Sequence, residues 1–331
     1  MGALTELLRD LPGPDIAARA AVEARAMSVL RPRGALARLD EVAAWLAAWQ
    51  RTERPDVRSP RAIVFVADHG VAERDVSAYP QTVTAVMLKA LQRGVATASA
   101  MASKLNVALQ IVDVGVGRPT GDITVGPALD HDRFEECLEA GRAAVAAAKA
   151  DLIVLGEMGI ANTTAAAAVC TTLFGLTAAD WTGRGTGVDD AGYERKVAAV
   201  EAARRRAKGS RALEVLREVG GAELVAIAGA CIEARHRSIP VLLDGFVVTA
   251  ALAPLEVVRQ GTLDHCLAGH CSSEPGHRRL LEKLAKPPLL DLDLRLGEGS
   301  GALLALPLVK LAAASVTEVA TFSAWGLTQP Q

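Results

Sequence analysis

The sequence predicts an α/β protein whose parallel sheet is covered by helices on both faces. Short apolar segments recur along the chain, separated by Ala-rich segments that are typical of helices. Several apolar segments end in Gly together with Asp, His or Glu. An apolar segment without alternation is typical of a strand that is buried on both faces, as strands of a covered parallel sheet are.

Five apolar segments are the expected strands. They are Ala62–Ala67, Val107–Val112, Leu152–Leu155, Pro240–Leu243 and Cys266–Ala268. In open parallel sheets, ligands bind beyond the carboxyl ends of the strands. The polar residues that follow these segments therefore predict an active site at that edge.

The chain length of 331 residues favours about two domains. The alternating pattern covers residues 56–299, which we expect to form a large catalytic α/β domain. The segments 1–55 and 300–331 have helical composition and lie outside the pattern. We expect these two terminal segments to pack together as a small helical domain.

Composition excludes several classes of protein. The net charge is −2, from 36 basic and 38 acidic residues, so no nucleic-acid partner is expected. The five cysteines are scattered without a C-x-x-C pair, which favours reduced thiols in a cytoplasmic protein over a zinc site or disulfide framework. Pro and acidic residues interrupt the apolar stretch Ile239–Val258, so no membrane span is expected there.

Three glycine-bearing stretches are candidate binding elements. Asp151–Thr164 has the pattern of a strand, a loop and a capped helix start, which suits a phosphate, although an ordinary capped helix has the same pattern. Thr182–Asp190 holds three glycines in five residues and is either a phosphate-binding or a mobile loop. Leu294–Ala302 places Glu298 between two glycines before an apolar helix, where it is either a functional carboxylate or a helix cap.

The histidines do not predict a metal site. His265, His270 and His277 are close in sequence but lack metal-ligand spacing, so hydrogen bonding within loops is the favoured interpretation. His69 directly follows an expected strand and is a candidate for the active-site edge.

The sequence resembles one family, the nicotinate-nucleotide–dimethylbenzimidazole phosphoribosyltransferases, over nearly its whole length. The similar segments occur in the family's order. They are Arg31–Leu39, Ala67–Val71, Val76–Thr84, Gly156–Thr164, Gly183–Gly187 with Lys196, Pro240–Phe246, Ser272–His277, Arg295–Ala302 and Glu318–Phe322.

The resemblance implies a doubly wound, Rossmann-like domain and a small helical domain, in a homodimer without metal or cofactor. It implies transfer of the phosphoribosyl group of nicotinate mononucleotide to 5,6-dimethylbenzimidazole, giving alpha-ribazole 5′-phosphate and nicotinate for cobalamin assembly. It assigns Glu298 as catalytic base and places Glu157 in the loop that binds phosphate and ribose. A carboxylate near the anomeric carbon can also stabilise oxocarbenium character, so Glu157 is in addition a candidate electrostatic partner. The implied binding residues are Ser77, Tyr79 and Gln81 for the accepting base, and Gly159, Ile160, Asn162, Thr163, Gly185, Lys196 and Arg295 for phosphate and ribose.

A few departures from the family pattern leave the accepting base open. Gly269 stands where many relatives have Ser, Ala35 and Ala37 replace Ser and Gly, and the segment 117–125 is short. The same transfer to adenine, another benzimidazole or a phenol is therefore the second hypothesis. A catalytically silent nucleotide-binding or regulatory protein is the third, against which the presence of both Glu157 and Glu298 argues.

Overall fold

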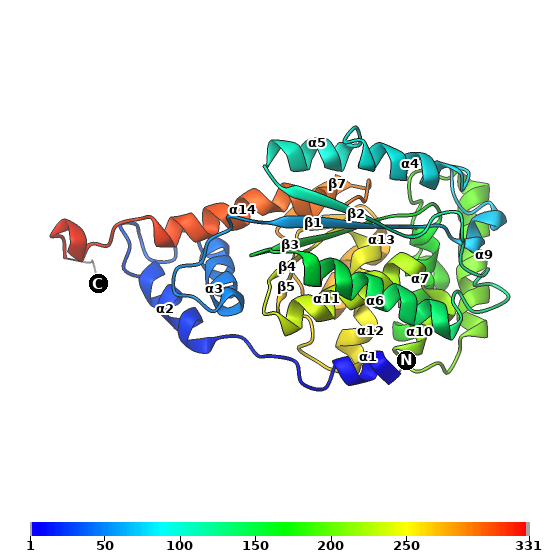
Figure 1. The fold of residues 1–331 in the computed structure, drawn as a ribbon, viewed down its shortest axis with the longest axis horizontal. Coiled ribbons are helices and arrows are strands. Elements are labelled where there is room, and N and C mark those ends of the chain that lie inside the picture. Colours follow the sequence, from blue (N-terminus) through cyan, green and yellow to red (C-terminus); the bar gives the residue numbers. More distant parts are fainter. Residues whose placement is uncertain (1, 329–331) are drawn as a thin grey trace.

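The computed structural model describes residues 2–328 and confirms an α/β fold with a parallel central sheet (Figure 1). The sheet has five strands in the order β2-β1-β3-β4-β5, and each neighbouring pair is parallel. The strands are β1 (Arg61–Ala67), β2 (Ala108–Gly115), β3 (Ile153–Met158), β4 (Val241–Leu243) and β5 (Cys266–Ala268). The order changes direction between β1 and β3, as in a doubly wound sheet.

Side chains of β1 alternate between two hydrophobic cores, which explains its uninterrupted apolar sequence. Ile63 and Phe65 belong to one core cluster, whereas Val64 and Val66 belong to the other. Both faces of this strand are therefore covered, as the sequence predicts. The edge strand β2 is covered less completely and keeps several partly exposed residues.

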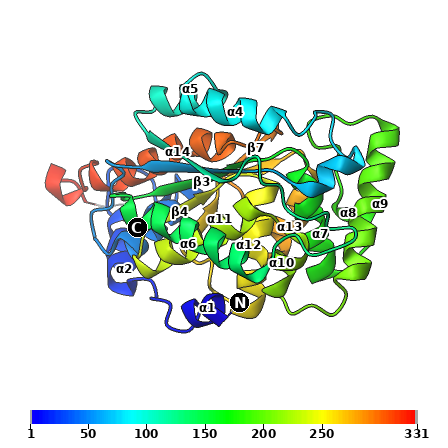
Figure 2. The same cartoon turned by 45° about the vertical axis from the view of Figure 1, so that its right-hand side comes forward.

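Helices form a layer on each face of the sheet, as Figure 2 shows, with α4 and α5 above the strands and α6, α11 and α12 below them. The lower layer comprises α6 (His131–Ala147), α7 (Asn162–Phe174), α11 (Ala222–His236) and α12 (Phe246–Val258), with α1 (Gly2–Leu7), α8 (Ala178–Trp181), α9 (Asp190–Arg206) and α10 (Glu214–Val219) around it. The upper layer comprises α4 (Val83–Gln92), α5 (Thr97–Lys104) and α14 (Ser300–Thr317).

A second, two-stranded parallel sheet, which the sequence pattern did not predict, lies beside the first. It consists of β6 (His270–Ser272) and β7 (Leu290–Leu294), and α13 (Pro275–Lys283) connects them. These strands are too short and too polar to produce an apolar segment in the sequence. Two 3-10 helices, η1 (Gly70–Arg74) and η2 (Ser323–Trp325), complete the described elements.

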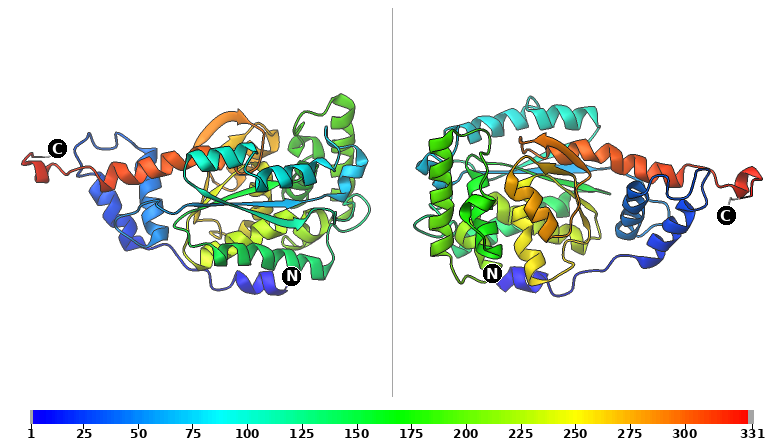
Figure 3. Two further views of the ribbon diagram at one scale, coloured as in Figure 1. Left: turned by 45° about the horizontal axis from the view of Figure 1, so that its top comes forward. Right: turned by 180° about the vertical axis from the view of Figure 1, so that it is seen from behind.

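Helices of the N-terminal segment lie beside the C-terminal half of α14 (Figure 3). Helices α2 (Ile16–Ala26) and α3 (Arg38–Gln50) pack against α14, and Val29 forms an antiparallel bridge with Thr321. Helix α1 lies elsewhere, because Leu4 and Leu8 are buried in the lower core of the sheet. The division into residues 56–299 and the paired segments 1–55 and 300–331 stays a prediction.

Helix α14 is, within residues 2–328, the one helix that is long and apolar enough to cross a membrane. Its 18-residue window has a mean hydropathy of 1.6, and 56% of that window is buried. It packs against α3, α5 and β3. An apolar helix that is mostly covered by protein is typical of a core helix, so this composition is weak evidence for a membrane span.

Helices α6 and α11 lie in close contact, and each has a glycine at the point where the two helices meet. A Cβ on Gly141 would lie 1.8 Å from the Ala226 carbonyl oxygen, and one on Gly229 would lie 2.2 Å from that of Leu138. These distances leave no room for a methyl group, so the two glycines set the separation of the helices.

We expect Gly141→Ala to destabilise the fold by about 1–3 kcal/mol, the usual cost of overpacking, because α6 and α11 must move apart. The free energy of unfolding, measured by denaturant titration, checks this. Gly126→Ala is the matched control, because a Cβ at Gly126 has no atom within 4 Å. Equal stability of both variants would contradict the prediction.

Candidate active site

A cavity of about 390 Å³ opens at the carboxyl edge of the sheet, where the sequence predicts the active site. It is bounded by residues from β3, the start of α7, the loop before α9, the start of α12 and the turn before α14. Eleven of the twelve predicted site residues line it: Ser77, Tyr79, Glu157, Gly159, Ile160, Asn162, Thr163, Gly185, Lys196, Arg295 and Glu298. The twelfth, Gln81, is half-buried and is not among the lining residues.

Glu298 lies in a turn of unusual backbone conformation between β7 and α14. Its φ is +62°, and its neighbours Gly297 and Gly299 have φ of +82° and +79°. A side chain in this left-handed region costs energy, and such residues cluster at functional sites. The turn buries the Glu298 side chain and aims its carboxylate at α5, where Oε2 accepts a hydrogen bond of 3.2 Å from the Ala98 backbone N–H.

Burial raises the pKa of Glu298 above its usual range, and the negative charge of Asp244 acts in the same direction. The Ala98 N–H opposes this rise because it stabilises the carboxylate. Glu298 therefore keeps its proton more readily than a free Glu does. The hydrogen bond to the Glu298 carboxylate comes from the first turn of α5.

Asp244, after β4, holds the start of α14 in place. Its carboxylate accepts hydrogen bonds from the backbone N–H groups of Gly299, Gly301 and Ala302, at 3.1, 2.8 and 3.0 Å. Asp244 is fully buried, so these three donors replace the water it has lost. The sequence marked Asp244 only as a polar residue after a strand. Its partners lie more than 50 residues away along the chain and could not be identified there.

A close backbone contact places Glu157 and Glu298 side by side. A Cβ on Gly156 would lie 2.5 Å from the Gly299 backbone nitrogen, so β3 and the turn before α14 touch directly. The Glu298 N–H donates to the Glu157 carbonyl oxygen at 2.9 Å. A backbone hydrogen bond therefore connects the two glutamates at the carboxyl edge of the sheet.

Glu157 is buried, and its Oε2 accepts a hydrogen bond from the Asn162 side-chain amide. Burial raises its pKa to about 8, and the nearby carboxylates of Glu223, Asp244 and Glu298 add to the rise, against the effect of Asn162. Glu157 is therefore mostly protonated at neutral pH. A neutral carboxylic acid beside Glu298 differs from the charged partner that the sequence suggested.

A second group of residues surrounds the start of α7. Lys196 of α9 is 1% exposed, and its Nζ donates to Thr163 Oγ1 at 2.8 Å. The Gly185 backbone N–H donates to Glu274 Oε1 at 2.8 Å, which fixes the glycine loop next to Lys196. Burial lowers the pKa of Lys196, and Glu274 partly offsets this. A buried ammonium group beside a helix N-terminus suits a phosphate.

Apolar side chains form another part of the cavity wall. They are Val76, Val83, Met87, Ile160, Phe246, Val247 and Leu296. Ser77 and the half-exposed Tyr79 lie in the loop before α4, and Ser77 Oγ accepts a hydrogen bond from the Tyr79 N–H at 3.3 Å. This mixture of apolar walls and a few hydroxyl groups suits a flat aromatic ring.

His69 does not line the cavity, although the sequence made it a candidate for the active-site edge. It is fully buried, its Nε2 lies 2.6 Å from Glu223 Oε1, and it is not among the cavity-lining residues. The pair lies behind Gly159, where a Cβ would be 3.3 Å from both side chains. His69 therefore lies behind the cavity wall, paired with Glu223.

Five polar cavity residues were not assigned a role from the sequence: Arg184, Thr186, His270, Ser272 and Glu274. Three of them belong to or precede the segment Ser272–His277, whose resemblance to the family was the available signal. His270 Nε2 lies 3.3 Å from Asp244 Oδ1. His277 is not a lining residue, and burial lowers its pKa to about 3, so it is neutral.

The fold and cavity are those of an α/β enzyme that binds a small molecule at the carboxyl edge of its sheet. A family model described as phosphoribosyltransferase matches residues 11–326. The chain belongs to the nicotinate-nucleotide–dimethylbenzimidazole phosphoribosyltransferase family, which confirms the resemblance seen in the sequence.

Relatives that carry this name resemble the chain along nearly its full length. The protein from Ruegeria pomeroyi is 47% identical, with 98% of each chain covered. The protein from Brucella anthropi is 44% identical, over 98% of this chain and 96% of the relative. A solved structure of this name from Thermus thermophilus has a TM-score of 0.90 and 40% identity, over 96% of this chain and all of its own.

The raised pKa of Glu157 predicts a pH-dependent stability. A carboxyl group whose pKa rises on folding, here from 4.5 to about 8, stabilises the fold below pH 4.5 and loses this contribution as the pH rises through 8. We expect Glu157→Gln to flatten the fall in unfolding free energy over this range. Denaturant titrations at several pH values check it, with the exposed Glu282→Gln as control. Parallel pH profiles for parent and Glu157→Gln would contradict the assignment.

Proposed function

We propose that this protein transfers the phosphoribosyl group of nicotinate mononucleotide to 5,6-dimethylbenzimidazole, releasing nicotinate, in the assembly of the cobalamin nucleotide loop. The observation that carries the proposal is the pairing of two buried glutamates, Glu157 and Glu298, in the cavity that also holds Lys196. The names of the relatives, at 44–47% identity, support the same reaction.

The donor's chemistry explains the phosphate-binding group of residues. The pyridine nitrogen of nicotinate mononucleotide carries positive charge, so its bond to the ribose is already activated. When that bond breaks, the electron pair stays on the pyridine nitrogen and nicotinate leaves without a proton from the protein. We assign the phosphate to Lys196, Thr163 and the first turn of α7, where charge-assisted hydrogen bonds fix its position.

The acceptor's chemistry explains the glutamates. One ring nitrogen of the benzimidazole attacks the anomeric carbon with its lone pair, and the other nitrogen must then lose its proton. We assign Glu298 as the base that takes this proton, since its raised pKa suits proton transfer near neutral pH. Glu157 is the neutral neighbour. Two carboxyl groups with different partners in one site can divide acid and base roles.

The remaining residue roles follow the family resemblance. Ser77 and Tyr79 lie in the loop that we assign to the accepting base, with Gln81 next to it. Gly159, Ile160, Asn162, Gly185 and Arg295 bound the donor. Alignment of two substrates in one cavity is worth roughly 7–11 kcal/mol of the barrier. The family resemblance also supports a homodimer and a cytoplasmic location.

The second candidate is the same transfer to another base. The exposed Tyr79 and the Ser77 hydroxyl leave room for rings with different substituents, so adenine, other benzimidazoles and phenols are alternative acceptors. Purified protein is incubated with nicotinate mononucleotide, with and without 5,6-dimethylbenzimidazole, and nicotinate release is measured. Release that depends on 5,6-dimethylbenzimidazole supports the proposal. Faster release with another base favours the second candidate, and no release with any base refutes both.

Glu298→Gln keeps the shape of the side chain and removes its basicity. We expect turnover to fall by about 10²–10⁴-fold, the usual contribution of a general base, while donor binding persists. Steady-state rates at saturating substrates check this, with the exposed Glu282→Gln as control. If the variant turns over within a few-fold of the parent, Glu298 is not the base and Glu157 becomes the next candidate.

Lys196→Ala and Asn162→Ala test the donor site. Hydrogen bonds to charged groups are worth about 1.5–3 kcal/mol, so nicotinate mononucleotide should bind about 10- to 150-fold more weakly, with little change for the accepting base. Calorimetric titration measures both affinities, and the exposed Lys208→Ala is the matched control for loss of a positive charge. Donor affinity that stays at the parent value would remove both residues from the phosphate site.

A further inference from the structure

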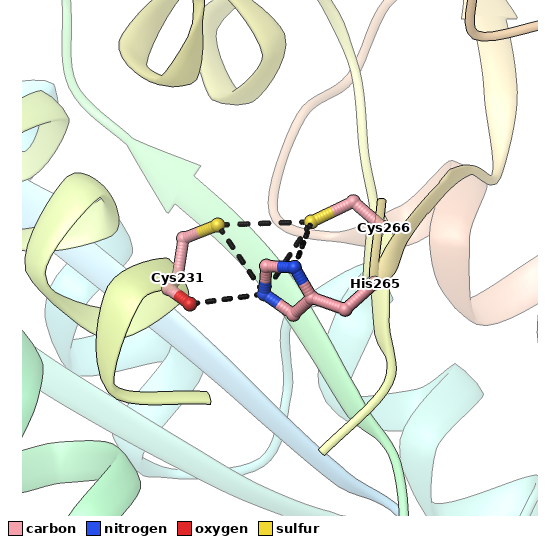
Figure 4. Close-up of side chains that lie close together, drawn as sticks. All are labelled: Cys231, His265 and Cys266. Atoms are coloured by element: carbon pink, nitrogen blue, oxygen red, sulfur yellow. Dashed lines mark hydrogen bonds between the residues drawn. The ribbon is translucent and has the colours of Figure 1, made fainter. Parts of the chain in front are cut away.

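The side chains of two cysteines and a histidine, Cys231, His265 and Cys266, lie close together (Figure 4). Cys231 lies on α11, and His265 and Cys266 lie at the start of β5. All three side chains have no exposed surface. They lie at the amino ends of the strands, whereas the candidate active site lies at the carboxyl ends, so the reaction proposed above does not use them.

The distances among the three donor atoms match one face of a metal-centred tetrahedron. Cys231 Sγ and Cys266 Sγ are 3.6 Å apart, and each lies 3.7 Å from His265 Nε2. Zinc binds sulfur at about 2.3 Å and imidazole nitrogen at about 2.0–2.1 Å. In a tetrahedral site these bonds place two sulfurs about 3.8 Å apart and sulfur about 3.6 Å from nitrogen. To bind an ion among these donors, the His265 ring has to rotate, because Nε2 now faces the Cys231 carbonyl oxygen and Cys266 Sγ is equally far from both ring nitrogens.

We propose that Cys231, His265 and Cys266 form a structural site for a soft divalent metal ion, with Zn²⁺ as the expected ligand. Two sulfurs and one imidazole select thiophilic ions over Mg²⁺ or Ca²⁺, which require oxygen. Within residues 2–328, these three side chains form a group whose donor atoms lie close enough together to bind one metal ion. The Cys231 carbonyl oxygen, 3.0 Å from His265 Nε2, is the nearest further oxygen donor in the cluster.

Metal binding has a defined proton balance. Each thiol loses one proton to solvent, so two protons leave as one divalent ion enters and the site stays neutral. His265 Nε2 lies within hydrogen-bonding distance of the Cys231 carbonyl oxygen. To bind the ion through Nε2, the ring takes the tautomer with its proton on Nδ1, next to Cys266 Sγ at 3.7 Å.

An aromatic ring and a guanidinium group pack beside the cluster. Arg235 stacks on Trp49 of α3 at 4.2 Å, and the Trp49 ring meets the His265 ring edge-on at 5.7 Å. A bound ion would thus join α11 to β5 beneath α3 and stabilise the contact of α3 with the sheet.

Metal uptake by the full-length chain tests the proposal. Reduced protein is denatured with a chelator, refolded with or without one equivalent of Zn²⁺, and passed through gel filtration before its metal content and melting temperature are measured. We expect one bound Zn²⁺ per chain and a higher melting temperature. Cys266→Ser and His265→Asn should lose the ion, whereas Cys137→Ser, which changes another buried cysteine, should keep it.

Co²⁺ gives a readout that does not depend on the variants folding. Refolding of the parent with Co²⁺ should produce intense sulfur-to-metal charge-transfer absorption, which requires thiolate ligands. Absence of this absorption together with no retained Zn²⁺ overturns the proposal. It is also overturned if Cys266→Ser keeps the ion. Equally, if the reduced chain binds no metal but peroxide converts Cys231 and Cys266 to a disulfide, the cluster is a redox pair instead.

Discussion

The candidate active site depends on one backbone contact, between Gly156 of β3 and Gly299 at the start of α14. A methyl group at Gly156 would lie 2.5 Å from the Gly299 nitrogen, so any larger residue would separate the two segments. Because they touch, Glu157 and Glu298 become neighbours although 140 residues separate them in the chain. The turn at this contact has a left-handed backbone, and Asp244 accepts hydrogen bonds from the N–H groups that follow it.

Three carboxyl groups share this small volume, and each differs in its partners. Asp244 accepts three backbone N–H groups. Glu298 accepts one backbone N–H, and Glu157 accepts the Asn162 side-chain amide. Burial raises the pKa of both glutamates, that of Glu157 to about 8, and Asp244 adds to the rise at each. The two glutamates therefore share the cause of their raised pKa values but differ in their hydrogen-bond donors.

The sequence predicted what depends on local pattern and missed what depends on distant contacts. Uninterrupted apolar segments revealed the strands of the main sheet, and the glycines around Glu298 revealed the turn. The short polar strands β6 and β7 carry no such pattern. The burial of His69 against Glu223 joins residues 154 positions apart, and the meeting of Cys231 with Cys266 spans 35 positions. Neither has a spacing that sequence alone can interpret.

Helix α14 connects the active site with the helices of the N-terminal segment. Asp244 accepts hydrogen bonds from N–H groups at the start of α14. At the other end, carbonyl groups accept hydrogen bonds from arginines of the N-terminal segment. Arg25 donates to the carbonyls of Val316 and of Val319 just after the helix, and Arg31 donates to that of Ser315. An acidic group at the N-terminus and basic groups at the C-terminus both match the helix dipole. Because α14 also packs on β3, it connects the terminal helices with the strand that carries Glu157.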